Sequence, residues 1–193
     1  MGDKGPILVT GAAGQLGAVG RAVAGLLLDR GLPVRAMVRR EDDRAAVARE
    51  VGVDALVNMS QMTVSQMSIQ NTTPSPQQRQ HWLSEQALAW SGLPVVTIRP
   101  TVFLEGFFLP LTGPSVRDRS RIELPFGRGK TNPVASADVA QVVAAVLADP
   151  VPHLGQVYEL TGPQSQDMHA VAREYSEALN REVTYADIPP EDW

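Results

Sequence analysis

The chain has 193 residues, of which 44% are hydrophobic, and this is enough for one domain with a sizeable core. Its net charge of −4, without a basic run, does not favour direct contact with nucleic acid. The absence of cysteine excludes disulfides and thiolate metal sites, and the three scattered histidines argue against a metal centre. No long apolar stretch and no signal peptide is visible, so we expect a soluble, cytoplasmic protein without a membrane partner.

The first expected element is a short apolar strand, "PILVT", which leads into the glycine-rich turn "GAAGQLG". In a strand–turn–helix setting, Gly11 permits a tight turn, Gly14 allows close approach of a pyrophosphate, and Gly17 allows the helix to pack on the strand. The free amides at the start of the helix then face the phosphate charge. We therefore predict that a dinucleotide binds here, with a purely structural turn as the alternative. The predicted contact residues are Gly11, Ala13, Gly14, Gln15, Leu16 and Gly17.

The helix that follows carries one apolar face, and Gly31 with Pro33 just beyond it predicts where this helix ends. The next strand, "PVRAMV", leads to Arg39 and Arg40, and acidic residues come only afterwards. A guanidinium accommodates the 2′-phosphate of NADP, whereas an acidic residue holds the free 2′-hydroxyl of NAD. The pattern favours NADP(H) over NAD(H). The alternative is that both arginines are solvated surface charges.

Strands and helices continue to alternate along the rest of the chain. We expect strands at "DALVNMS", "LPVVTIRP" and "QVYELTG", a loop over 70–80, and helices over 79–91, over 137–149 and at "QDMHAVAREYSEALN". In the helix over 79–91, Trp82, Leu83 and Leu88 are expected on or near the apolar side. Such alternation is typical of an α/β protein with a parallel sheet.

Several segments in this order resemble one family. They are "VTGAAGQLG", "VRR", "GVDALVNMSQM", "SGLPVVTIRPTVFLEGF", "ADVAQVVAAVLADP" and "GQVYELTGP". Together they resemble the NmrA-like branch of the atypical short-chain dehydrogenases/reductases, which includes NAD(P)H-dependent quinone and azo-compound reductases and redox-sensing regulators. The resemblance implies a doubly wound, Rossmann-type parallel sheet with a small C-terminal substrate region.

The chain departs from this family in its length. Two strand–helix units, roughly 60 residues, are missing near 44–47, and the C-terminal region is also short. The resemblance implies an NAD(P)-binding core over 1–102, a substrate-side segment over 103–135, and the remaining core helix and strand with the C-terminal region over 136–193. A natural deletion, a designed shortening and the omission of residues from the printed string would all give this sequence.

These alternatives differ in geometry. Omitted residues would leave a discontinuity between about Arg40 and Val51, with Val57 two strands away from Val9. A continuous chain would instead pair "DALVN" beside "ILVT" or "VRAMV", and a partner subunit, as in a homodimer, would cover the bare sheet edge.

The second departure concerns catalysis. The wider superfamily uses a Tyr-x-x-x-Lys pair, but Gln77 and His81 stand at these two positions. His81 could orient the nicotinamide or supply a proton, and its alternative is a histidine on the helix surface. Ser60 follows a strand at the edge of the sheet where ligands bind, so it is a second catalytic candidate, with a strand-end cap as its alternative. Pro100 and Val102 complete the predicted cofactor site.

Phe103 and Phe107 follow Pro100 and could form an aromatic wall for a flat acceptor, although core packing is the better explanation for each of them taken singly. We therefore predict an NADPH-dependent oxidoreductase, without the Tyr-x-x-x-Lys pair, that reduces a small planar acceptor such as a quinone. The alternative is a non-catalytic NADP(H) sensor that signals to a protein partner.

Overall fold

The structure, a computed structural model, describes residues 5–10, 18–37 and 54–193 of the chain. The chain divides into two compact units. Unit 1 comprises Met1–Pro100 and Ser136–Leu160, and unit 2 comprises Thr101–Ala135 and Thr161–Trp193. The predicted discontinuity between about Arg40 and Val51 lies outside the described residues.

Unit 1 begins with a parallel pair of strands joined through a helix. Strand β1 (Ile7–Thr10) pairs with β2 (Val34–Met37), and helix α1 (Ala18–Asp29) lies between them in the sequence. Val23 and Leu27 of α1 are buried, as the apolar periodicity predicted. The helix ends where expected: Gly31 has a φ of +72°, and its N–H donates to the carbonyl of Leu28 at 2.8 Å. This left-handed conformation is a common helix end because glycine has no Cβ.

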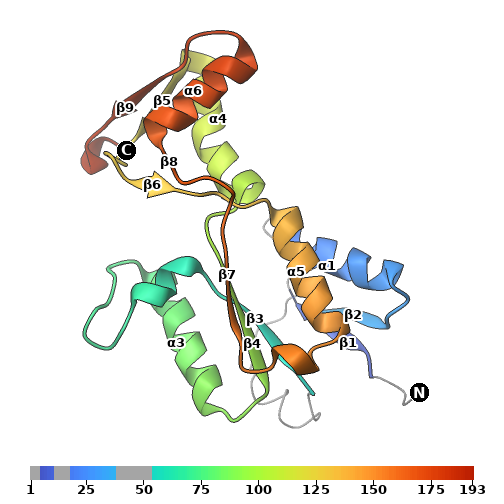
Figure 1. Ribbon diagram of the computed structural model, residues 1–193. Coiled ribbons are helices and arrows are strands. Elements are labelled where there is room, and N and C mark those ends of the chain that lie inside the picture. The colour runs from blue at the N-terminus through green and yellow to red at the C-terminus, as the bar shows by residue number, and fades with distance from the viewer. Residues whose placement is uncertain (1–4, 11–17, 38–53) are drawn as a thin grey trace. The chain divides into compact units, whose positions relative to one another are not determined.

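The second sheet of unit 1 holds three parallel strands in the order β3–β4–β7. They are β3 (Leu56–Met59), β4 (Val95–Pro100) and β7 (Val157–Leu160). The central strand β4 is the most deeply buried, and Val96 and Ile98 are fully inaccessible to solvent. Helix α3 (Pro76–Trp90) lies on one side of this sheet and α5 (Ser136–Ala148) on the other (Figure 1). Parallel strands with helices on both faces confirm the predicted doubly wound α/β class.

The two sheets of unit 1 are not joined by a ladder among the described residues. Strand β3 pairs with β4 and not with β1 or β2, so the pairing expected for a continuous chain is wrong in the described part. Helix α5 connects the two sheets instead, because it packs against both α1 and β3. Arg30 also donates to the carbonyl of Ala144 on α5 at 3.0 Å.

Helix α3 starts earlier and faces differently than the sequence suggested. The loop expected over 70–80 is wrong from Pro76 onward, because Ser75 is the N-cap and Pro76 takes the first helical position, which needs no N–H donor. A short 3₁₀ helix, η1 (Met62–Gln66), precedes it. The residue of α3 that is buried is Glu85, whereas Leu83 is 58% exposed. The expected placement of Leu83 on an apolar side is therefore wrong.

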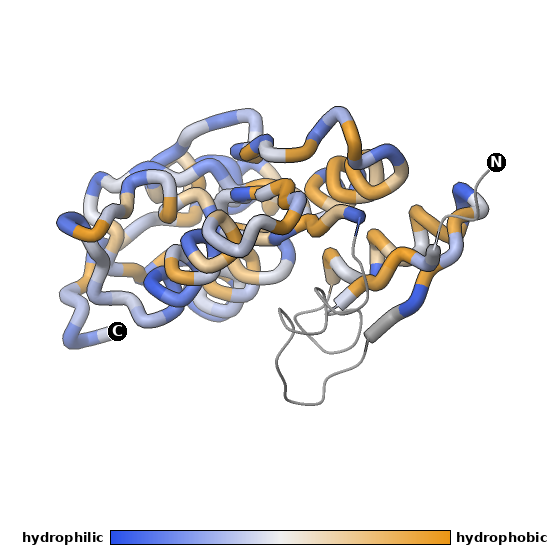
Figure 2. The backbone as a smooth tube through the Cα atoms, turned by 90° about the horizontal axis from the view of Figure 1, so that it is seen from below, coloured by the Kyte–Doolittle hydropathy of each residue, from blue (hydrophilic) through white to orange (hydrophobic). Residues whose placement is uncertain are grey.

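Unit 2 has its own hydrophobic core, formed around a parallel strand pair. Strand β5 (Arg121–Leu124) pairs with β9 (Thr184–Asp187), and helices α4 (Leu109–Arg119) and α6 (Met168–Leu179) complete the core. The buried cluster consists of Phe108, Val116, Ile122, Leu124, Met168, Val171, Ala172 and Val183. Hydrophobic and hydrophilic residues are interspersed along the helical turns of the backbone (Figure 2).

The remaining elements are short. Unit 2 also contains the π-helical turn η2 (Leu104–Phe108), the antiparallel pair β6 (Lys130–Thr131) and β8 (Gln166–Asp167), and the 3₁₀ turn η4 (Pro190–Asp192). A 3₁₀ turn in unit 1, η3 (Val151–His153), lies between α5 and β7 in the sequence. No helix among the described residues is long and apolar enough to cross a membrane.

Candidate active site

The carboxyl end of strand β3 carries buried polar groups that lack partners. Ser60 follows the strand, is 4% exposed, and is held by its backbone N–H, which donates to the carbonyl of Ile98 at 2.8 Å. Among the described residues, Ser60 Oγ, Asn58 Nδ2 and Gln61 Nε2 are buried without a hydrogen-bond partner. A buried donor without a partner costs about 1–3 kcal/mol, so three of them on one short stretch indicate a place where a ligand supplies acceptors.

His81 lies in the second turn of α3 and is half-buried. Burial lowers the pKa of its imidazole below the ordinary value of 6.5, and the nearby Glu85 carboxylate offsets part of this effect. At neutral pH the ring is therefore uncharged. Its nitrogens make no hydrogen bond to another described residue, so the ring is free to exchange a proton with a bound molecule or with water.

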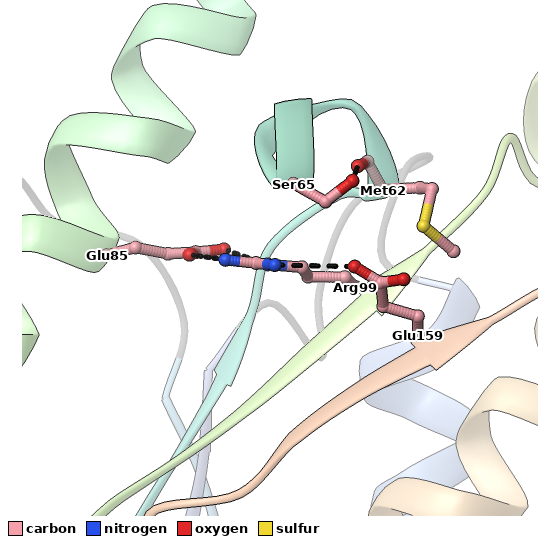
Figure 3. Close-up of polar contacts among 5 residues, drawn as sticks. All are labelled: Met62, Ser65, Glu85, Arg99 and Glu159. Atoms are coloured by element: carbon pink, nitrogen blue, oxygen red, sulfur yellow. Dashed lines mark hydrogen bonds and ion pairs between the residues drawn. The ribbon is translucent and has the colours of Figure 1, made fainter. Parts of the chain in front are cut away.

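An ion-paired cluster holds α3 to the sheet (Figure 3). Arg99 on β4 donates from Nε to Glu85 Oε1 at 3.0 Å and from Nη2 to Glu85 Oε2 at 2.6 Å. Its Nη1 reaches Glu159 Oε1 on β7 at 3.4 Å. Glu85 is 9% exposed and Arg99 19%, so this fork-shaped pair is largely removed from solvent.

This cluster follows from local structure. Arg99 and Glu159 are register partners on adjacent parallel strands, and Glu85 is one helical turn after His81. The hydrogen bonds to both carboxylates raise the pKa of Arg99 above its ordinary value, with the Glu85 bond as the main cause. Sequence reasoning missed the cluster. The available signal was an arginine near the end of an otherwise apolar strand, since charged residues are seldom buried unless they are paired.

The predicted dinucleotide loop lies outside the described residues, as do Arg39 and Arg40. The elements on either side of the loop are in place: β1 ends at Thr10 and α1 runs from Ala18. A strand therefore precedes the loop and a helix follows it, as the glycine spacing requires.

The other predicted site residues belong to both units. Pro100 is the buried last residue of β4 in unit 1. Val102, Phe103 and Phe107 belong to unit 2, where Val102 packs partly against the core. Phe107 is 53% exposed, and it is the neighbouring Phe108 that is buried in the core. Core packing therefore accounts for Phe108 but does not account for Phe107.

The three tyrosines of the chain lie far from α3 in the sequence and have hydrogen-bond partners of their own. Tyr158 is hydrogen-bonded to His153 Nδ1 at 2.7 Å, Tyr175 to Thr112 at 2.8 Å, and Tyr185 to the carbonyl of Leu124 at 2.9 Å. None of these tyrosines lies on α3. In the described part of the chain, no group of three His, Cys, Asp or Glu side chains is arranged to hold a metal ion.

Comparison with known proteins agrees with a nucleotide-dependent reductase fold. The chain is 28% identical over 227 residues to the (4-alkanoyl-5-oxo-2,5-dihydrofuran-3-yl)methyl phosphate reductase of Streptomyces griseus, covering 94% of this chain and 77% of that protein. It is 25% identical over 230 residues to quinone oxidoreductase 2 of Escherichia coli, covering 97% of this chain and 79% of that protein. No protein-family model matches the chain.

Two solved structures share the fold. An NADPH-dependent quinone oxidoreductase from Escherichia coli superimposes with a TM-score of 0.77 at 21% identity, over 96% of this chain and 79% of that one. The triphenylmethane reductase of Citrobacter sp., complexed with NADP(H), superimposes with a TM-score of 0.73 at 19% identity. The match covers 97% of this chain and 81% of that one. The fold and these matches define a Rossmann-type α/β protein. The named relatives support the resemblance of the chain to the NmrA-like branch of the atypical short-chain dehydrogenases/reductases.

The alignment with the Streptomyces reductase is longer than the part of this chain that it uses. The match to the Streptomyces reductase spans 227 residues but uses 94% of the 193 residues here, which is about 181. About 46 aligned positions therefore have no residue of this chain opposite them. The loss of two strand–helix units near 44–47 stays a prediction.

Proposed function

We propose that the chain is an NADPH-dependent oxidoreductase that reduces a small planar acceptor such as a quinone. The observation that carries the proposal is the set of buried, unpartnered polar groups at the carboxyl end of β3, where ligands bind in open parallel sheets. The relatives and solved structures named above are reductases, and this favours an enzyme over the alternative of a non-catalytic sensor.

The residues present fit a nicotinamide cofactor. Bound NADPH would supply the hydride. The hydroxyl of Ser60 and the amides of Asn58 and Gln61 offer donors for its carboxamide or for a carbonyl oxygen of the acceptor. The glycine-rich loop and Arg39 would hold the pyrophosphate and the 2′-phosphate. These assignments come from the sequence.

Reduction of a quinone to a hydroquinone consumes one hydride and one proton from the medium. With no tyrosine on α3, the proton reaches the acceptor oxygen through His81 or through water. Because the imidazole is uncharged at neutral pH, His81 first takes a proton from solvent and then transfers it. The Arg99–Glu85 pair keeps the turn that bears His81 attached to the sheet.

The test is NADPH oxidation with a panel of quinones, together with equilibrium binding of NADPH and NADH. We expect turnover of at least one quinone and an approximately ten- to hundredfold preference for NADPH, the range given by one charge-assisted arginine–phosphate contact. Gly14→Asp should abolish binding of both cofactors, and Arg39→Ala should remove most of the preference. Tight binding of both redox forms without turnover would instead support the sensor.

A further inference from the structure

An uncharged groove lies beside α3, beyond the end of β3. It is lined by Met67, Ser68, Ile69, Gln70, Trp82 and Gln86 and has a volume of about 460 Å³. We call it the Trp82 groove. This volume falls in the range of sites for small organic ligands. The four loop residues follow Ser60 through η1, so the groove is built on the segment that leaves the candidate active site.

The loop that forms one wall is held by its own hydrogen bonds. Ser68 and Asn71 exchange backbone hydrogen bonds at 2.9 and 3.2 Å, and the Asn71 side chain donates to the carbonyl of Gln66 at 2.8 Å. Ser68 Oγ also accepts from the backbone N–H groups of Gln70 and Asn71. The geometry is therefore set before a ligand arrives, which lowers the entropy lost on binding.

This loop presents an apolar side chain to solvent. Ile69 is 84% exposed at its tip, although isoleucine is among the residues most often buried. Met67 and Trp82 line the same groove and are half-buried. An apolar residue held in water by an ordered loop, next to an indole ring, indicates a surface that a ligand covers.

The chemistry of the lining selects the class of ligand. None of the six residues is titratable, so an ionic ligand would find no counter-charge. The indole ring and two apolar side chains suit a flat conjugated body, and the two glutamine amides can donate to carbonyl oxygens.

We propose that the Trp82 groove is the binding site for the acceptor and that it takes an uncharged planar carbonyl compound of the quinone class. This inference rests on the proposed function. It places the acceptor in unit 1, against Ile69 and Trp82.

The test measures binding of 2-methyl-1,4-naphthoquinone in the absence of NADPH. An NMR titration that monitors the indole N–H signals gives the Kd. The chain contains no cysteine, so the quinone has no thiol to alkylate. Ile69→Ser removes the exposed apolar wall, and Leu83→Ser is the matched control because Leu83 is 58% exposed on the same helix as Trp82 but does not line the groove. We expect the Kd to rise about fivefold or more in Ile69→Ser, from lost apolar contact, and to stay unchanged in Leu83→Ser.

Turnover then separates this inference from the proposed function. We expect Ile69→Ser to raise KM for the quinone by the same factor, with kcat and NADPH affinity unchanged. Weaker quinone binding in Ile69→Ser without any NADPH oxidation by the parent chain would support the groove and refute the oxidoreductase. Equal quinone affinity in both variants would overturn the groove, whether or not the parent chain turns over. Self-association that disappears in Ile69→Ser, without quinone binding, would assign the surface to a second copy and also overturn it.

Discussion

At the scale of single residues, the end of β3 buries polar groups that have no hydrogen-bond partner among the described residues. Ser60 is almost completely buried, yet its hydroxyl has no partner among the described residues. A serine that served only as a strand-end cap would use its hydroxyl for a local hydrogen bond. The unpartnered hydroxyl therefore favours a binding role over the capping alternative.

We predict opposite effects of Ser60→Ala on stability and on binding. Removing an unpartnered buried hydroxyl should raise the free energy of unfolding of the cofactor-free chain by about 1 kcal/mol. The loss of one hydrogen bond to the ligand should weaken NADPH binding by about two- to tenfold. Urea unfolding and equilibrium titration measure the two effects. A destabilised variant with unchanged NADPH affinity would show that the hydroxyl is structural.

His81 should make the stability depend on pH in one direction. Its pKa in the folded chain is lowered by burial, so the unfolded chain binds more protons between that pKa and about 6.5. The stability that the uncharged His81 contributes is complete above about pH 6.5, and it is lost as the pH falls toward the pKa of His81 in the folded chain. His81→Gln should therefore lose less stability than the parent between about pH 7.5 and about pH 5.5. Parallel pH profiles of the two proteins would contradict this prediction.

At the scale of elements, helix ends and one interior ion pair decide how unit 1 is held together. Helix α1 ends through a glycine with positive φ, and α3 is fixed to the sheet through a charged residue on its buried side. The apolar pattern of α3 is therefore a poor guide to its orientation. Its most buried residue, Glu85, is stabilised by Arg99 and not by apolar contact.

One glycine inside α1 and one just beyond its end should respond to alanine in opposite directions. Gly31→Ala places a Cβ at a φ of +72° and should cost about 1–2 kcal/mol. Gly25 lies inside the helix, where an added Cβ meets nothing within 4 Å, so Gly25→Ala should stabilise by about 0.5–1 kcal/mol. Thermal unfolding of the two variants tests this pair. A stabilising Gly31→Ala would mean that the left-handed helix end does not form.

Removing one partner of the Arg99–Glu85 ion pair should destabilise the chain more than removing both partners. Glu85→Leu leaves the largely buried Arg99 guanidinium with only its longer contact to Glu159, and we expect a loss of about 2–4 kcal/mol. Adding Arg99→Leu should recover part of this loss, because no unpaired charge remains buried.

A double-mutant cycle of urea unfolding measures this coupling. The control is Asp118→Asn, which breaks the exposed Arg117–Asp118 pair and should change nothing measurable. Additive effects at positions 85 and 99 would show that the two side chains do not interact in solution.

At the scale of the whole molecule, the chain is predicted to lack an internal segment near 44–47 that members of the family carry. About 46 residues of the Streptomyces reductase alignment have no counterpart here, and in the described part of the chain no ladder connects β1 with β3. In a sheet of strand order 3-2-1-4-5-6, the fourth strand joins the first to the fifth. The observed separation of β1–β2 from β3–β4–β7 is what the loss of that strand would leave.

Supplying the segment that is predicted to be missing should therefore raise both the stability and the NADPH affinity of the protein. We expect a chimaera that takes the corresponding internal residues of Escherichia coli quinone oxidoreductase 2, inserted between residues 40 and 51, to bind NADPH about tenfold more tightly, or ~1.4 kcal/mol. Its free energy of unfolding should also rise, because β1 and β3 gain a strand between them. A glycine–serine insert of equal length is the control. Equal NADPH affinity in the parent, the control and the chimaera would show that the gap has no functional consequence.

Much of this molecule could be predicted from local signals. The apolar runs that became β1, β3 and β4, the α1 face that buries Leu27 and the helix end at Gly31 are visible in the sequence, because periodicity and turn chemistry depend on neighbouring residues. Other features depend on which faces meet in three dimensions. The inward position of Glu85, the unpartnered hydroxyl of Ser60 and the groove beside Trp82 arise only when α3, η1 and the sheet pack together. Burial and pairing are properties of that packing, and local pattern does not encode them.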